Sequence, residues 1–81
     1  MYKNRAENGL FNISGANIRK YRQALPGKVS QRMLADMLQV EGLDLDKNAI
    51  QKIETGLRFI TDIEIKIFAK VLHVSYADLL D

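Results

Sequence analysis

One short segment, Ser30–Gly56, constrains the fold of this chain more than any other part. Ser30 is a residue type that caps helix N-termini, and the apolar side chains after it recur at helical spacing, at Leu34, Ala35 and Leu38. The end of the segment, 47–56, carries Ile50 and Ile53 on one edge and polar side chains on its other faces. Gly56 follows where a helix end favours positive φ. The segment therefore predicts two short helices joined by a connector.

The polar surface of the second of these helices is its most informative property. Lys47 and Asn48 precede its two isoleucines, and Gln51 and Lys52 lie between them. Two short helices, the second with such side chains, are the layout of a helix-turn-helix that reads DNA. A solvated polar helix face is the simpler alternative for this composition taken alone.

Composition limits the classes of protein to which the chain can belong. The 81 residues suit one domain, and 47% apolar residues favour a globular chain. The absence of cysteine excludes disulfides and thiolate metal sites, and it fits a reducing compartment. No uncharged stretch approaches the roughly 20 residues of a membrane span. We expect a cytoplasmic protein, associated with the nucleoid when bound to DNA, without metal or cofactor and without a membrane partner.

Charge is distributed unevenly along the chain. Residues 1–33 carry seven basic and one acidic side chains, whereas residues 34–81 carry five basic and nine acidic ones. A basic half favours polyanion binding, although a solvated charged surface explains the asymmetry equally well.

Capping residues and apolar periods predict five helices and no strand. The first runs from about Ser14 to Leu25, and the second from Ser30 to about Val40. Asp46 caps the third, a Thr61–Glu64 capping box starts the fourth, which reaches about His73, and Ser75 starts a short last helix. The expected core consists of Ile18, Tyr21, Leu34, Ala35, Leu38, Ile50, Ile53, Ile65, Phe68, Ala69, Leu72 and Leu79.

The N-terminus lacks a clear period. We expect residues 1–12 to form a flexible arm and residues 13–81 to form the domain. The arm is either an ordinary frayed terminus or a basic arm that contacts DNA through Lys3 and Arg5.

Several patterns, in order along the chain, resemble the Cro/repressor-type (XRE-like) helix-turn-helix family. They are Ile18-Arg19-Lys20-Tyr21-Arg22, Ser30-Gln31 with Leu34-Ala35, Ile50-x-x-Ile53-Glu54-x-Gly56, and Ile65-x-x-Phe68-Ala69-x-x-Leu72-x-Val74 through to Leu79. The resemblance covers residues 14–81 and implies an all-α, compact five-helix lambda-repressor-like DNA-binding domain, in which helices two and three form the helix-turn-helix.

Two positions depart from the family pattern. Gln39 stands where the family usually has a glycine after the helix-two leucine, so that the connector 39–46 is enlarged. His73 stands where the family usually ends a helix with glycine, and we interpret it as a helix-end residue that interacts with the dipole. The enlarged connector leaves the angle of helix three open.

The resemblance also implies roles for individual residues in DNA binding. The residues expected to face bases in the major groove are Lys47, Asn48, Ala49, Gln51 and Lys52. Those expected to contact phosphates are Gln31, Arg32, Lys28, Thr55 and Arg58. Arg22 and Glu54 are expected to form a structural ion pair between the first and third helices.

The fourth predicted helix is apolar on two sides. Its second stripe, together with the last helix, gives a candidate dimer surface composed of Ile63, Ile67, Val71, Tyr76 and Leu80. Burial of this stripe within the domain is the alternative. A homodimer would suit a palindromic operator, because two reading helices would lie one DNA turn apart.

These patterns predict a sequence-specific double-stranded DNA-binding transcriptional regulator, acting as a repressor. The alternative is a protein-interaction module on the same fold, an antitoxin-like protein or a partner of a regulatory protein. An enzyme is disfavoured, because one histidine, no cysteine and no phosphate-cradling glycine loop leave no catalytic constellation.

Overall fold

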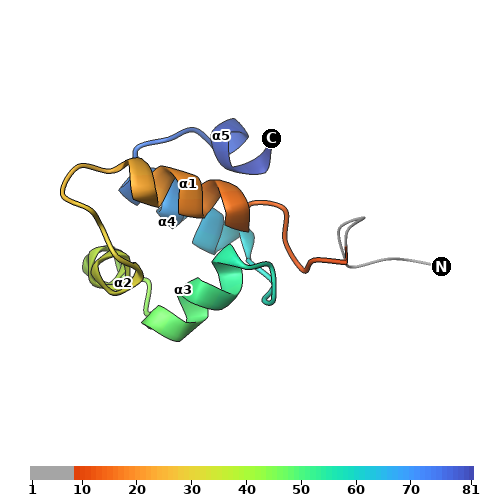
Figure 1. Ribbon diagram of the computed structural model, residues 1–81, viewed down its shortest axis with the longest axis horizontal. Helices are drawn as coiled ribbons and strands as arrows, with labels where there is room; N and C mark the ends of the chain where they lie inside the picture. The colour runs from red at the N-terminus through yellow and green to blue at the C-terminus, as the bar shows by residue number, and fades with distance from the viewer. Residues whose placement is uncertain (1–8) are drawn as a thin grey trace.

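The computed structural model describes residues 9–81, and this part of the chain folds into five α-helices without a strand. The helices are α1 (Gly15–Ala24), α2 (Gln31–Val40), α3 (Lys47–Glu54), α4 (Asp62–Leu72) and α5 (Tyr76–Leu80). Figure 1 shows α3 on the side of the molecule opposite α5, with α1 between them. The predicted all-α, five-helix fold is therefore confirmed.

Four helices begin as the capping residues predicted. The side chains of Ser30, Asp46, Thr61 and Ser75 each accept a hydrogen bond from a backbone N–H in the first turn of the following helix. At α4 and α5 the acidic side chain at the third helical position also accepts a hydrogen bond from the backbone N–H of the cap residue, which completes a capping box. These short helices thus satisfy N–H groups that would otherwise lack partners.

The start of α1 differs from the expectation. Ser14 lies at the N-cap, but its hydroxyl is fully buried and forms no hydrogen bond in the described part of the chain. Asn12 supplies the bond instead, because its Oδ1 atom accepts from the N–H of Gly15 at 2.8 Å. The helix therefore starts where predicted, but a different residue binds its first turn.

Three helices are followed by a residue in the left-handed conformation, which the sequence indicated at Gly56. Gly42 and Gly56 follow α2 and α3 with φ of 88° and 80°. His73 ends α4 with φ of 59°, a value that costs a residue with a Cβ more than it costs glycine. After each helix, the next N–H reaches back to a carbonyl of the last turn, as from Leu57 to Lys52 at 2.8 Å.

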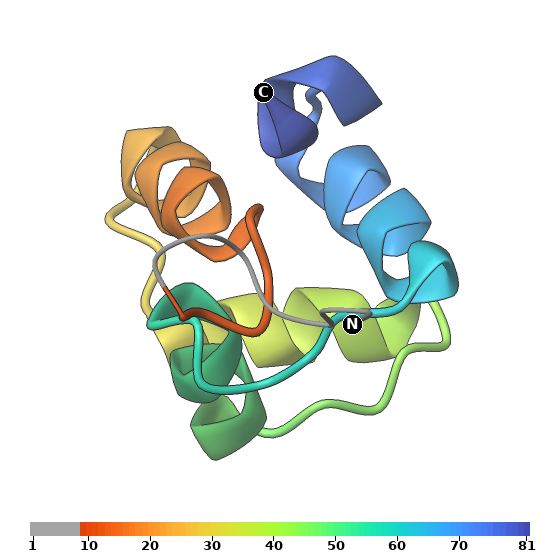
Figure 2. The same cartoon turned by 90° about the vertical axis from the view of Figure 1, so that its right-hand side faces the viewer.

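The core lies between α1 and α4, which stand on opposite sides of the view in Figure 2, and it extends to α2 and α3. Most of the expected core residues are buried, whereas Tyr21, Ala35 and Ile65 are only half-buried and pack against it. Val29 and Val71 are core residues that the sequence analysis did not include. Val29 lies in the loop between α1 and α2, where helical periodicity gives no information.

The segment before α1 corrects the predicted domain boundary. The N–H of Phe11 donates to the carbonyl of Gly56 at 2.8 Å, and the rings of Phe11 and Phe59 lie 4.7 Å apart between centroids. Asn12 is buried. Residues 10–12 therefore pack against the domain instead of forming an arm. The rest of the predicted arm, including Lys3 and Arg5, lies outside the described residues.

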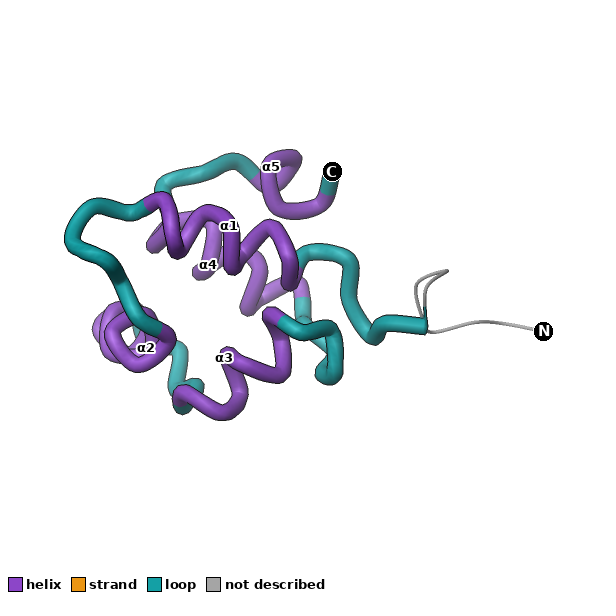
Figure 3. Tube along the Cα trace, in the orientation of Figure 1, coloured by secondary structure: helices purple, strands orange, loops and turns teal. Residues whose placement is uncertain are grey.

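The connector between α2 and α3 is non-helical through Leu43–Asp46, as the tube in Figure 3 shows. Leu43 and Leu45 are half-buried and pack against the core, while Asp44 and Asp46 are exposed. The two leucines anchor a connector that lacks regular structure, and they leave its acidic side chains in solvent.

Candidate nucleic-acid interface

Helix α3 separates its residues sharply into two faces. Ile50 and Ile53 are fully buried, which fixes the inner face against α1 and α2. The residues predicted to face bases lie outside this inner face; they are Lys47, Asn48, Ala49, Gln51 and Lys52. Ala49 is half-buried, and the other four are exposed. The structure therefore gathers the predicted base-facing residues on one helix, with their polar ends in solvent.

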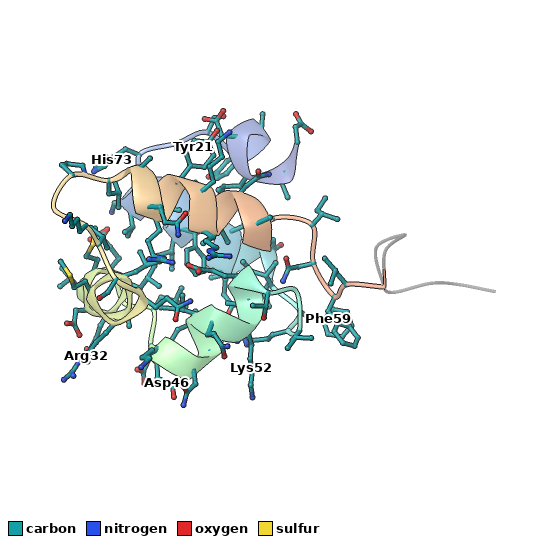
Figure 4. The ribbon with its side chains drawn as sticks, viewed as in Figure 1. Tyr21, Arg32, Asp46, Lys52, Phe59 and His73 are labelled. Atoms are coloured by element: carbon teal, nitrogen blue, oxygen red, sulfur yellow. The ribbon has the colours of Figure 1, made fainter. Side chains whose placement is uncertain are left out.

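The start of α2 lies beside this face. Arg32 is exposed on the first turn of α2, and Lys28 is exposed in the loop before it. In Figure 4, Arg32 on α2 and Lys52 on α3 point toward the same side of the molecule, away from α5. The two helices thus present cationic side chains together, beside the N–H groups at the start of α2.

Gln31 has a contact that the sequence did not indicate. Its side-chain Nε2 donates to Oε1 of Glu54 at 3.0 Å, so the amide is engaged within the protein. Its position at the first residue of α2 leaves the backbone N–H, instead of the side chain, as the group that can meet a phosphate.

Arg22 and Glu54 form a buried, two-pronged ion pair. Nε and Nη2 of Arg22 donate to the two carboxylate oxygens of Glu54 at 2.7 and 3.0 Å, and Nη1 donates to the carbonyl of Val29 at 2.8 Å. The side chains are only 10% and 1% exposed. The fork geometry satisfies both charges in a place that excludes water. The pair joins α1, the turn before α2 and the end of α3.

Thr55 and Arg58 also have partners within the domain. The hydroxyl of Thr55 donates to the carbonyl of Gln51 at 2.9 Å. The Nη1 and Nη2 atoms of Arg58 donate to the carboxylate of Glu64 at 3.1 and 3.0 Å. Both residues retain some exposure near the end of α3, but neither side chain is free of internal contacts.

The Arg58–Glu64 pair shifts the pKa of each partner. Burial by itself raises the pKa of Glu64, but hydrogen bonds from Arg58 and Thr61 together outweigh it, so the pKa lies below its ordinary value. The hydrogen bond to Glu64 raises the pKa of Arg58. Both groups therefore favour their charged forms, and Glu64 also completes the capping box of α4.

The candidate dimer surface is only partly exposed. Ile63, Tyr76 and Leu80 are 67%, 53% and 40% exposed, and Ile67 is half-buried. Val71 is 7% exposed and belongs to the core, so we remove it from this surface. The second apolar stripe of α4 is therefore buried at Val71, which the periodicity of a single helix does not reveal.

Two residues that sequence reasoning missed lie behind the end of α3. Asn12 donates through Nδ2 to the carbonyls of Ile53 and Arg58 at 3.0 and 2.8 Å. A Cβ on Gly15 would lie 2.0 Å from the carbonyl oxygen of Ile53, so only glycine permits the approach of α1 to α3. An asparagine three residues before the first helical residue was the available signal, and it indicated only a local cap.

The described residues offer little for other kinds of site. Residues 9–81 contain no cluster of three or more histidine, cysteine or acidic side chains that would hold a metal ion. None of the helices in the same region is long and apolar enough to cross a membrane.

Comparison with known proteins agrees with this geometry. A helix-turn-helix family model, HTH_3, matches residues 18–79, which includes all of α2, α3 and α4. Neither the curated proteins nor the solved structures contain a match to this chain. The matched region spans most of the sequence and contains the two helices whose exposed faces carry the candidate contacts. The chain therefore belongs to the Cro/C1-type (XRE) helix-turn-helix family of DNA-binding regulators.

Proposed function

We propose that this protein is a sequence-specific transcriptional repressor that reads the major groove of double-stranded DNA with α3. The outer face of α3 is the observation that carries the proposal. Ile50 and Ile53 fix the helix from within, and the exposed side chains on the other side are those that recognise base edges. We infer a binding protein, and no enzymatic activity.

Each residue of that face has a suitable partner in the groove. The amides of Asn48 and Gln51 match the N6 and N7 atoms of adenine, and Lys47 and Lys52 match O6 and N7 of guanine. The methyl group of Ala49 matches the methyl group of thymine. A well-formed bidentate contact contributes about 1–3 kcal/mol of discrimination between bases.

Phosphate contacts position α3 in the groove. We assign them first to Arg32, to Lys28 and to the backbone N–H of Gln31, which lie at or before the start of α2. Thr55 and Arg58 flank the other end of α3, and we assign them outer phosphate contacts in addition to their contacts within the domain.

A homodimer on a palindromic operator completes the proposal. The exposed apolar side chains of Ile63, Tyr76 and Leu80, with Ile67 beside them, form the surface that we assign to the partner copy. Two α3 helices about 34 Å apart would then match one turn of DNA. Binding at a promoter in the cytoplasm, on the nucleoid, would block access of the transcription machinery.

Selection of bound duplexes from a random DNA pool tests the proposal. We expect an enriched palindrome, with half-sites about one turn apart, and an affinity that falls with salt by a slope of roughly −0.9 per phosphate neutralised. Weak and sequence-blind binding at low salt would reject the proposal and favour a protein-interaction module.

A further inference from the structure

Side-chain hydrogen bonds from other segments of the described chain reach α3 at one end. Among the described residues, the side-chain hydrogen bonds that reach α3 from α1, α2 and the segment before α1 all end on its last turn, at Ile53 and Glu54. At its first turn, the side chain of Asp46 binds Ala49 locally, within the connector and the helix. The hydrogen bonds that join α3 to other segments are therefore concentrated at its last turn.

Asn12 occupies the centre of the fixed end. Its Oδ1 atom accepts from Gly15 at the start of α1, and its Nδ2 atom donates to Ile53 in α3 and to Arg58 in the loop before α4. One buried amide thus joins three segments through one acceptor and two donors. Asparagine fits this position because aspartate lacks the donors, and an aliphatic side chain would leave both carbonyls without this partner.

The close approach at Gly15 makes this junction stiff. A Cβ at Gly15 would overlap the carbonyl oxygen of Ile53, and a Cβ at Gly56 would overlap the side chain of Leu10. The backbones of α1 and of the end of α3 are therefore in direct contact around Asn12, with no intervening side chain that can yield.

A small rotation of α3 about its last turn displaces its first turn considerably. The eight residues of α3 span about 12 Å, so a tilt of about 10° displaces the first turn by about 2 Å. Hydrogen bonds to base edges tolerate much less than this displacement, whereas flexible Lys and Arg contacts to phosphates accommodate it. The angle of α3 therefore controls base reading more strongly than it controls overall affinity.

We propose that Asn12 is a positioning residue for base recognition, which sets the tilt of α3 by joining its last turn to α1 and to the α3–α4 loop. This inference rests on the proposed function, because it assigns the tilt of α3 to the reading of bases. Asn12 itself contacts no DNA in this proposal.

Asn12→Ser provides the sharpest variant. A serine hydroxyl can still accept from the N–H of Gly15, as in local Ser/Thr caps, but it is too short to reach both carbonyls. Asn12→Ala is the harsher second variant, since it also removes the cap. Val71→Ala in α4 is the matched control, because it weakens the core without touching the junction at the end of α3.

Two measurements on the full chain test whether Asn12 sets the tilt of α3 and thereby controls base recognition. Backbone N–H residual dipolar couplings of the free protein report the orientation of α3 relative to α1 and α4. Competition binding compares the selected duplex with duplexes that carry single base changes. In Asn12→Ser we expect the α3 couplings to depart from the wild-type orientation and base discrimination to fall roughly tenfold, with an unchanged salt slope. Val71→Ala should retain both properties.

The proposal is overturned if Asn12→Ser and Asn12→Ala retain the wild-type α3 couplings, or if they retain wild-type base discrimination. Failure of the proposed function has a different signature, because the wild-type protein itself would then show no preference among duplexes. In that case the couplings alone decide whether Asn12 sets the tilt of α3.

Discussion

Glu54 illustrates at the residue scale how one buried side chain can organise a small domain. Its carboxylate accepts two bonds from Arg22 and one from Gln31, and thereby joins α1, α2 and α3. A charge with only 1% of its side chain exposed requires such a set of donors, because desolvation without partners costs several kcal/mol. The last residue of α3 therefore also fixes this helix to the rest of the domain.

Replacement of this carboxylate should destabilise the domain strongly. Glu54→Gln leaves the guanidinium of Arg22 buried without its counter-charge, and we expect a loss of about 3–5 kcal/mol in the free energy of unfolding. Urea denaturation of the purified variants measures this loss. The matched control is Glu41→Gln, which removes a carboxylate that pairs with the exposed Lys70 and should cost less than about 1 kcal/mol. Equal losses in the two variants would show that burial of the Arg22–Glu54 pair is energetically unimportant.

At the residue scale, how well a contact could be predicted depended on how far apart its residues lie in the sequence. The roles of Arg22 and Glu54 followed from a family resemblance, and the structure contains this pair. The bond from Gln31 to Glu54 and the bonds from Asn12 to Ile53 and Arg58 did not follow, because each joins residues 23 or more positions apart. An asparagine before a helix reads as an ordinary cap when only its neighbours are known.

At the scale of elements, the helices are too short to be stable by themselves. Isolated helices of fewer than about 12 residues are marginal in water, and α3 has only eight. Caps at Ser30, Asp46, Thr61 and Ser75 therefore set where the helices begin, while burial of one face maintains them. Such caps act over three residues, which is why the sequence located these helix starts well. At α1 the side chain of Asn12, and not that of Ser14, accepts from the first turn.

The start of α4 should make stability sensitive to acid. The folded-state pKa of Glu64 lies below its ordinary value, which is about 4.3 in unfolded chains. The unfolded state therefore binds the proton more tightly, and the contribution of Glu64 is fully present above about pH 4.3 and lost as pH falls through the folded-state pKa. Glu64→Gln, which retains a capping-box side chain, should lose less stability than wild type over this range.

Thermal unfolding of both proteins between pH 7 and pH 3 measures this difference. Asp36→Asn, which removes an exposed carboxylate from α2, controls for the change in net charge. The assignment to Glu64 would be wrong if wild type and Glu64→Gln lost stability in parallel as the pH falls.

The whole molecule separates its two candidate surfaces onto different elements. Arg32 on α2 and the polar side chains on the outer side of α3 form the candidate DNA surface, whereas the candidate dimer surface lies on α4 and α5. Figure 1 shows α5 and α3 on opposite sides of α1. A second copy seated on α4 and α5 would therefore leave the polar face of α3 accessible to DNA, as the proposed function requires.

Substitutions on the two sets of proposed DNA contacts should affect binding in distinct ways. Asn48→Ala should relax base preference at one or two positions and cost about 1–3 kcal/mol on the preferred duplex. Arg32→Ala should weaken binding nearly equally on all duplexes and reduce the salt slope by about one. Competition binding across single-base variants, repeated at several salt concentrations, separates the two effects. A reversed pattern would refute the roles assigned to Asn48 and Arg32.

The sequence by itself determined the family, the five helices, most of the core and the polar character of α3. The family was indicated by the resemblance of ordered motifs, whereas the other properties arise from side-chain chemistry and from spacings of three or four residues. The tertiary structure decided that residues 10–12 belong to the domain, that Val29 and Val71 are buried, and that Asn12 joins α1 to α3. Those outcomes depend on which distant surfaces meet, and helical periodicity carries no information about the partner that covers a given face.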